Sequence, residues 1–246
     1  MGRVTDSPLK KCCCLMKVHV INSGSSGNCY LLTDRENNSL IIEAGKGTFQ
    51  KCLPLIPDVA KIVACIYSHV HNDHAGDIKT VSEYMPIYGP EQFKHGEQIN
   101  MQLSGSYPFS VIPLAVEHDP GIDCYACFIR SNVEEKYIFF ATDCYNYSRI
   151  IDILPEPLSL AMVEVNHDAH MLDTSRYPAD LKERIRKTHC SVQRAGLAIN
   201  RAKCTRFLLV HPSDHNINEA DALAYFQKEF PNREFTFATP GVVLNF

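Results

Sequence analysis

The chain has 246 residues, of which 45% are hydrophobic and 21% are charged, and its formal net charge is −4. This composition is that of a globular protein that can bury a substantial core without disulfide staples, so its eleven cysteines are expected to be reduced. No apolar run approaches the ~20 residues of a membrane-spanning helix, which argues against an integral membrane protein.

Residues 1–15 precede the first strand-like run and are predicted to form a disordered leader. Their apolar stretch CCCLM is too short for a signal peptide and is followed by Lys17, so we expect a cytoplasmic protein. Metal binding or palmitoylation of the cysteine triplet at 12–14 stays open as an alternative, and Met16 is a candidate for the natural start. No Pro-, Gly- or Ser-rich linker divides the remainder, so residues 16–246 are predicted to form a single domain.

Strand-like apolar runs alternate with segments of helical periodicity along the rest of the chain. The strand-like runs cover residues 17–22, 29–33, 39–44, 62–68, 109–116, 124–130, 136–142, 158–165, 205–211 and 234–239. The helical segments cover residues 74–84, 90–96, 178–188, 191–203 and 217–229. This mixture favours an α/β fold with sheets at the centre and helices outside.

Side chains that bind metals gather where four of the predicted strands end. The stretch SHVHNDHAGD follows the run 62–68 and crowds four such side chains into six positions, and three more follow other strands. These seven residues are His69, His71, Asp73, His74, His118, Asp143 and His211. Strand ends at one edge of a sheet can bring distant ligands together, and imidazole with carboxylate suits Zn²⁺, Mn²⁺ or iron. The pattern therefore predicts a metal site.

The order of these motifs resembles the metallo-β-lactamase superfamily. IIEAG, HVHNDH, EHD, ATD and LVH occur in the family's order, and NSGSSGNCYLL, FATDCYN, EVNHDAHML and LVHPSDHN are similar to bacterial and bacteriophage members near the YycJ-type exonucleases. The resemblance implies a four-layer αββα sandwich with two divalent metal ions, Zn²⁺ being expected and Mn²⁺ the alternative. It places His69, His71 and His118 on the first ion, Asp73, His74 and His211 on the second, and Asp143 between them. Glu43 stands where many members have Asp, and such a residue supports the site.

A dinuclear centre of this kind is expected to make the protein a hydrolase. The two ions can share a hydroxide that attacks phosphorus or a carbonyl carbon, and Asp73 could help to handle the proton. We expect a phosphodiesterase, specifically a nuclease acting on DNA, so that nucleic acid is the partner; a homodimer is left open. The alternative is a small-molecule hydrolase that acts on a cyclic nucleotide, lactone or thioester. A metal-stabilised binding module is disfavoured, because a structural site is typically a closed four-ligand one.

Several residues outside the ligand set are candidates for contact with the substrate, and each also has a structural alternative. Residues 181–206 hold eight basic side chains and one acidic one, a net +7 against −11 elsewhere, and they form either a solvated face or a rim that attracts phosphate. His189 could donate a proton to the leaving oxygen, or make a structural hydrogen bond. The candidates for substrate contact are Ser25, Ser26, Asn166, His167, Lys187 and Ser191, with turns and helix caps as the alternative. Tyr145 and Tyr147 stack on a base or pack into the core.

Overall fold

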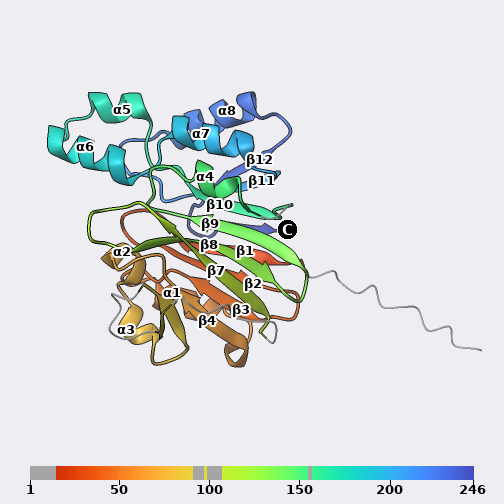
Figure 1. Cartoon of the computed structure of the whole chain (residues 1–246). Coiled ribbons are helices and arrows are strands. Elements are labelled where there is room, and N and C mark those ends of the chain that lie inside the picture. The colour runs from red at the N-terminus through yellow and green to blue at the C-terminus, as the bar shows by residue number, and fades with distance from the viewer. Residues whose placement is uncertain (1–14, 91–96, 99–106, 155–156) are drawn as a thin grey trace, which may run out of the picture.

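The computed structural model describes residues 15–90, 97–98, 107–154 and 157–246. Apart from Leu15 and Pro90, the predicted leader and the predicted helix at 90–96 lie outside the described residues. Two sheets packed face to face form the centre of the molecule, and helices cover both outer faces (Figure 1). This is the four-layer αββα sandwich, so the predicted fold class is confirmed.

The first sheet has seven strands in the order β13-β1-β2-β3-β4-β5-β6. In chain order its strands are β1 (Lys17–Asn22), β2 (Cys29–Thr33), β3 (Ser39–Ile42), β4 (Ile62–Ile66), β5 (Ile87–Gly89), β6 (Glu97–Gln98) and β13 (Val243–Asn245). All residues of β2 and β3 are buried, because both faces of these central strands are covered.

The second sheet has six strands in the order β12-β11-β10-β9-β8-β7. Its strands are β7 (Phe109–Val116), β8 (Cys124–Ser131), β9 (Lys136–Ala141), β10 (Leu160–Glu164), β11 (Arg206–Val210) and β12 (Glu234–Phe237). The inner faces of the two sheets share one buried cluster, in which Leu32, Ile42 and Ile66 of the first sheet meet Phe140 and Met162 of the second. Burial of this apolar surface between the sheets is the main force that holds them together.

Helices pack on the outer faces through two further apolar clusters. The first sheet carries α1 (Phe49–Cys52), α2 (Asn72–Ala75), α3 (Ile78–Val81) and two 3₁₀ turns, η1 (Leu53–Leu55) and η2 (Val59–Lys61). The second sheet carries α4 (Ser148–Ile151), α5 (Ala169–Thr174), α6 (Ala179–Thr188), α7 (Val192–Arg201) and α8 (Glu219–Glu229). None of the helices in the described part of the chain is long and apolar enough to cross a membrane.

The single helix predicted at 74–84 is wrong, because the chain breaks it into α2 and α3. A Cβ atom on Gly76 would lie 2.4 Å from the Asn72 oxygen and 2.5 Å from the Lys46 nitrogen, so only glycine allows this close approach. The Asp77 carboxylate accepts hydrogen bonds from the backbone N–H groups of Gly47 at 2.8 Å and Phe49 at 3.0 Å. These contacts fix the segment that carries the histidine cluster to the end of β3.

The strand directions bring the motif-bearing ends to one edge of the sandwich. β3 and β4 are parallel, and β9, β10, β11 and β12 are parallel to one another. β7 is antiparallel to β8 and β8 is antiparallel to β9, so β7 also runs in the direction of β9. The carboxyl ends of the parallel strands of an α/β sheet are where its sites usually form.

Candidate functional site

The seven side chains that the sequence predicts as metal ligands meet at this edge. Glu164 and His189 also lie there and form a further possible group with Asp143 and His211. His69 Nε2 lies 2.9 Å from His71 Nδ1, and the same Nδ1 lies 3.2 Å from His118 Nε2. Asp143 Oδ2 completes this set at 3.5 Å from His69 Nε2 and 3.8 Å from His118 Nε2. The first set therefore joins three imidazoles and one carboxylate from three separate segments.

The second set lies against the first and shares Asp143 with it. Asp73 Oδ2 lies 3.3 Å from His211 Nε2 and 3.4 Å from His74 Nε2. Asp143 Oδ2 is 3.4 Å from His74 Nε2, and Asp143 Oδ1 is 3.4 Å from His211 Nε2. One carboxylate thus faces both sets, which is the bridging position that the resemblance implies for Asp143.

Left-handed backbone aims three side chains at this edge. Glu43, Asp143 and His211 have φ angles of 61°, 49° and 54°, each just beyond the end of a buried strand. A non-glycine residue in this region costs about 1–3 kcal/mol, which surrounding contacts must outweigh. The Ser23 hydroxyl accepts the His211 N–H at 2.8 Å, and Glu43 Oε1 accepts the Ser68 N–H at 3.0 Å. Strain concentrated at three converging strand ends indicates a functional site.

Neighbouring groups hold the imidazole rings in place. Ser68 Oγ lies 2.9 Å from His69 Nδ1, and Glu43 Oε1 lies 3.6 Å from His74 Nδ1. Asn166 donates from Nδ2 to the His211 carbonyl oxygen at 3.0 Å. Such partners of metal-binding histidines usually fix ring orientation. Glu43 therefore supports the site without joining either set.

Except at His74, the protonation states of the two sets suit a cation. Burial alone would lower the pKa of His74, but the charges of Asp143 and Glu43 raise it well above its usual value, so a metal ion there would have to displace a proton. Burial and the charge of His74 lower the pKa of His69 well below its usual value, and burial lowers the pKa of His118 to about 4. Burial alone would raise the pKa of Asp143, but the charges of His211 and His74 hold it well below the usual range. Neutral imidazoles and an ionised carboxylate are the forms that bind metal.

The spacing of the donor atoms also fits a metal ion. Four ligands at about 2.0–2.2 Å from a tetrahedral ion lie roughly 3.3–3.6 Å from one another. Most of the separations above fall within a few tenths of an ångström of that range. The ligand atoms of the first set lie within 4.8 Å of one another, and so do those of Asp73, His74 and His211 in the second. Acceptor nitrogens that face one another across such distances need a shared cation or proton. The residues present thus fit divalent metal ions.

Glu164 and His189 form an ion pair beside the second set. Glu164, which ends β10 and is fully buried, lies with Oε1 2.6 Å from His189 Nδ1, and its Oε2 accepts the Cys144 and Cys190 N–H groups at 3.1 Å. Burial lowers the pKa of His189, but the Glu164 charge outweighs it and raises that pKa to about 9. The His189 ring stacks on that of His211 with centroids 5.4 Å apart. Glu164 is missing from the sequence-based set, although a carboxylate at the end of an apolar run is the same signal that finds Asp143.

A cleft of about 400 Å³ opens over this edge. Ser25, Asp73, Asp143 and His189 line it, together with Arg184 of α6. Ser25 is exposed there, as a substrate contact requires, whereas the hydroxyl of the equally exposed Ser26 accepts a hydrogen bond from Asn22 at 3.1 Å.

Three of the four remaining predicted substrate residues have structural partners for their side chains. Asn166 binds the His211 backbone, and the Ser191 hydroxyl caps α7 by accepting the Arg194 N–H at 3.3 Å. His167 is buried, and burial lowers its pKa to about 4. Lys187 pairs with Glu183 at 3.1 Å and lines a second hollow beside the cleft. These contacts account for the positions of Asn166, Ser191 and Lys187, whereas the buried Nδ1 of His167 has no hydrogen-bond partner among the described residues. Contact of all four with substrate stays a prediction.

The basic segment 181–206 does not act as one rim. Arg201 pairs with Asp152 and Arg206 with Glu234, away from the cleft. Arg184 makes a two-pronged ion pair with Asp119, at 2.6 and 3.3 Å, next to His118. Positive charge therefore reaches the site chiefly from α6 and the first turn of α7.

Comparisons with known proteins agree with this fold. The family model described as "Beta-lactamase superfamily domain" matches residues 38–212. The metallo-β-lactamase fold protein YhfI from Bacillus subtilis is 22% identical, with 94% of this chain and 100% of YhfI covered and a TM-score of 0.73. The short form of human tRNase Z is 17% identical, with 94% and 99% covered and a TM-score of 0.67. A diphosphatase from the PhnP family is 15% identical, with 94% and 98% covered and a TM-score of 0.64. No curated protein sequence matches the chain.

Proposed function

The chain belongs to the β-lactamase superfamily and has its metallo-β-lactamase fold, and from this premise we propose that it is a dinuclear metal-dependent phosphodiesterase. More narrowly, we propose a nuclease of the YycJ-type exonuclease branch that acts on DNA. His69, His71, His118 and Asp143 would hold one divalent ion, and Asp73, His74, His211 and Asp143 the other. Zn²⁺ is the expected metal and Mn²⁺ the alternative.

The pairing of His189 with Glu164 carries this proposal. A sugar alkoxide is a poor leaving group, and a hydrolase that expels one needs an acid within reach of the leaving oxygen. His189 lines the cleft and is charged at neutral pH, because its pKa is raised to about 9. Its Nδ1 is engaged by Glu164, and Nε2 makes no hydrogen bond to any residue that the structure describes, which leaves this atom for the substrate.

The chain's own residues supply binding, orientation and proton transfer. The two metal ions would act as Lewis acids on the phosphate and lower the pKa of a bound water. Asp73, held ionised by His211 and His74 although burial opposes it, can accept a hydrogen bond from the attacking water and orient it. Arg184 brings a positive charge to the rim of the cleft, where it attracts the phosphate. His189 gives its Nε2 proton to the leaving oxygen, and Glu164 stabilises the charged imidazole before that transfer.

Relatives of similar structure support the phosphodiester class. A tRNase Z and a diphosphatase share the fold over 94% of this chain, and so does the yeast PDE1, at 12% identity and a TM-score of 0.65. All three names refer to phosphate chemistry. They leave open the alternative that this chain hydrolyses a small molecule such as a cyclic nucleotide.

The test is hydrolysis by the metal-loaded protein of labelled single- and double-stranded DNA, RNA, a cyclic nucleotide, a lactone and bis-p-nitrophenyl phosphate. Wild type is compared with His71→Ala and with Asn132→Ala, a control in the turn between β8 and β9. We expect DNA hydrolysis that His71→Ala abolishes and Asn132→Ala keeps, and that weakens as salt rises. Turnover of the lactone alone, or of no phosphodiester, would refute the proposal.

A further inference from the structure

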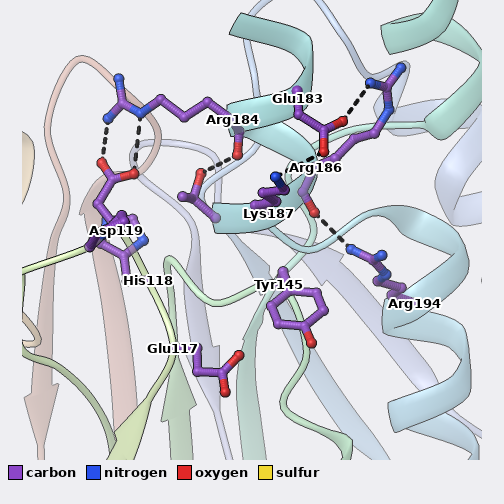
Figure 2. A pocket seen from close by; sticks show the side chains of 11 residues that line it. Glu117, His118, Asp119, Tyr145, Glu183, Arg184, Arg186, Lys187 and Arg194 are labelled. Carbon is purple, nitrogen blue, oxygen red and sulfur yellow. Dashed lines mark hydrogen bonds and ion pairs between the residues drawn. The ribbon is translucent and has the colours of Figure 1, made fainter. Parts of the chain in front are cut away.

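A second hollow of about 550 Å³ opens directly beside the metal cleft. His118, Arg184 and Thr188 line both spaces, so the two hollows adjoin and a substrate held over the ligand sets lies next to this one. Figure 2 shows this hollow, with Asp119 and Arg184 on one side, α6 above and Tyr145 below. We refer to it as the Tyr145 pocket. Its volume is within the range of about 300–1,000 Å³ that is usual for small-molecule sites.

The Tyr145 ring and the Arg194 guanidinium form the floor of the Tyr145 pocket. The Arg194 guanidinium lies over the Tyr145 ring, 4.8 Å from its centroid. Arg194 also donates from Nη1 to the Arg186 carbonyl oxygen at 2.8 Å, which ties the pair to the end of α6. Tyr147, two residues on, has a different role: it is fully buried, and its hydroxyl donates to the Glu164 carbonyl oxygen at 3.2 Å. Of the two tyrosines, Tyr145 is therefore the one that can meet a ligand.

The charges around the pocket leave Arg194 uncompensated. Arg184 is paired with Asp119, and Lys187 shares Glu183 with Arg186, which also pairs with Asp173. Among the residues that the structure describes, no carboxylate forms an ion pair with Arg194, although Glu117 also lines the pocket. A guanidinium that stacks on an aromatic ring and lacks a counter-charge attracts an anionic ligand that also has a flat, polarisable group.

We propose that the Tyr145 pocket binds the nucleoside next to the scissile phosphate of a single-stranded nucleic acid, with its base stacked on the Tyr145–Arg194 pair. This inference rests on the proposed function and specifies that the substrate is single-stranded. Stacking on a tyrosine and an arginine accepts every base, because every base has a π face. Lys187, which lines the pocket and has a side chain that is 71% exposed, would attract the next phosphate along the strand. A base-paired duplex would have to open before a base could enter.

The test compares two substrates that have the same leaving group. Thymidine 5′-(p-nitrophenyl phosphate) carries a nucleoside, and methyl p-nitrophenyl phosphate does not. We expect wild type to prefer the first in kcat/KM, and Tyr145→Ala to reduce that preference by roughly tenfold or more, since base–aromatic stacking is worth ~1–3 kcal/mol. Tyr145→Phe should retain the preference because it keeps the ring. Tyr225→Ala, which truncates a partly exposed tyrosine on α8, should also retain it.

A binding measurement separates this inference from the proposed function. Calorimetric titration with thymidine 5′-monophosphate and with inorganic phosphate should show tighter binding of the nucleotide, and Tyr145→Ala should remove most of the difference. If the protein hydrolyses neither p-nitrophenyl ester, the proposed function fails, and the titration alone decides the pocket. If it hydrolyses both and Tyr145→Ala changes them equally, the pocket assignment is overturned while the proposed function stands.

Discussion

Glu164 Oε1 lies 2.6 Å from Nδ1 of His189, although the two residues are 25 positions apart and helices α5 and α6 lie between them in the chain. The carboxylate is fully buried, whereas the imidazole lines the cleft. Because Glu164 also accepts two backbone N–H groups through Oε2, it cannot rotate away from the ring. The pair therefore presents one defined nitrogen of His189 to the substrate, and it does so next to the shared carboxylate of Asp143.

Glu164→Gln is expected to impair proton donation selectively. The glutamine oxygen can still accept the two backbone N–H groups, but its amide would then donate to His189 Nδ1 and remove the charge that favours the imidazolium. We expect kcat for dinucleotides, which release a sugar alkoxide, to fall by about 10²–10⁴-fold. For bis-p-nitrophenyl phosphate, whose leaving group needs no proton, kcat should change little. Steady-state kinetics with both substrates checks this, and an equal loss for both would mean that Glu164 has only a structural role.

Chelation is expected to lower thermal stability while keeping the fold. One apolar cluster lies between the two sheets, and the other two lie between a sheet and its helices. The ligand sets occupy only one edge, so the apoprotein keeps its core and should remain folded. A metal ion that binds only the folded state and is present at about 100 times its Kd adds about 2.7 kcal/mol to the free energy of unfolding. For a chain of this size that corresponds to a rise in Tm of roughly 5–10 °C. Calorimetry before and after metal is restored measures the shift.

Asp143→Asn provides the control for that experiment. The substitution replaces the carboxylate that both ligand sets share with a neutral amide, which binds metal more weakly. The Tm of this variant should therefore rise much less when metal is added. If the Tm of the wild type changes neither with chelator nor with added metal, the dinuclear site is contradicted.

Local periodicity was sufficient to predict most of the fold. Ten predicted strands appear within a few residues of their expected bounds, because alternating or continuous apolar runs are strong local signals. β5, β6 and β13 escaped prediction because strands of two or three residues are too short to show a period. The helix predicted at 74–84 failed for a tertiary reason: its periodicity continues through Gly76, but Asp77 is held by backbone N–H groups of a distant loop.

The site was predictable where chemistry coincides with a strand end. His118, Asp143 and His211 were found in this way, and the structure brings them together with His69. Ser23 and Asn28 were not singled out, because their partners are backbone groups far away in sequence: the His211 N–H and the Asp73 carbonyl oxygen. No pattern within a short window reports such a contact.

Asn166→Ala is expected to weaken metal binding at the second ligand set alone. Its amide donates to the His211 carbonyl oxygen at 3.0 Å and lies 3.3 Å from His211 Nδ1, so it holds a residue whose backbone is strained. Loss of such a partner typically costs 10–100-fold in metal affinity. Competition with a chromophoric chelator should show one weakened site and one unchanged site. Asn132→Ala, the same change far from the cleft, should alter neither, and equal weakening of both sites would rule out this role for Asn166.

Arg184→Gln is expected to raise KM and to change stability little. The Arg184 side chain is 59% exposed, so loss of its ion pair with Asp119 should cost less than about 1 kcal/mol. Arg184 nevertheless lines both the cleft and the Tyr145 pocket, where its charge meets the phosphate in the ground state and the transition state alike. Loss of such uniform binding raises KM, here by about 5–10-fold, with kcat within twofold. Arg201→Gln, which breaks a comparable exposed pair with Asp152 away from the cleft, is the matched control. If that variant raises KM as much as Arg184→Gln does, the effect is one of general charge and not of position.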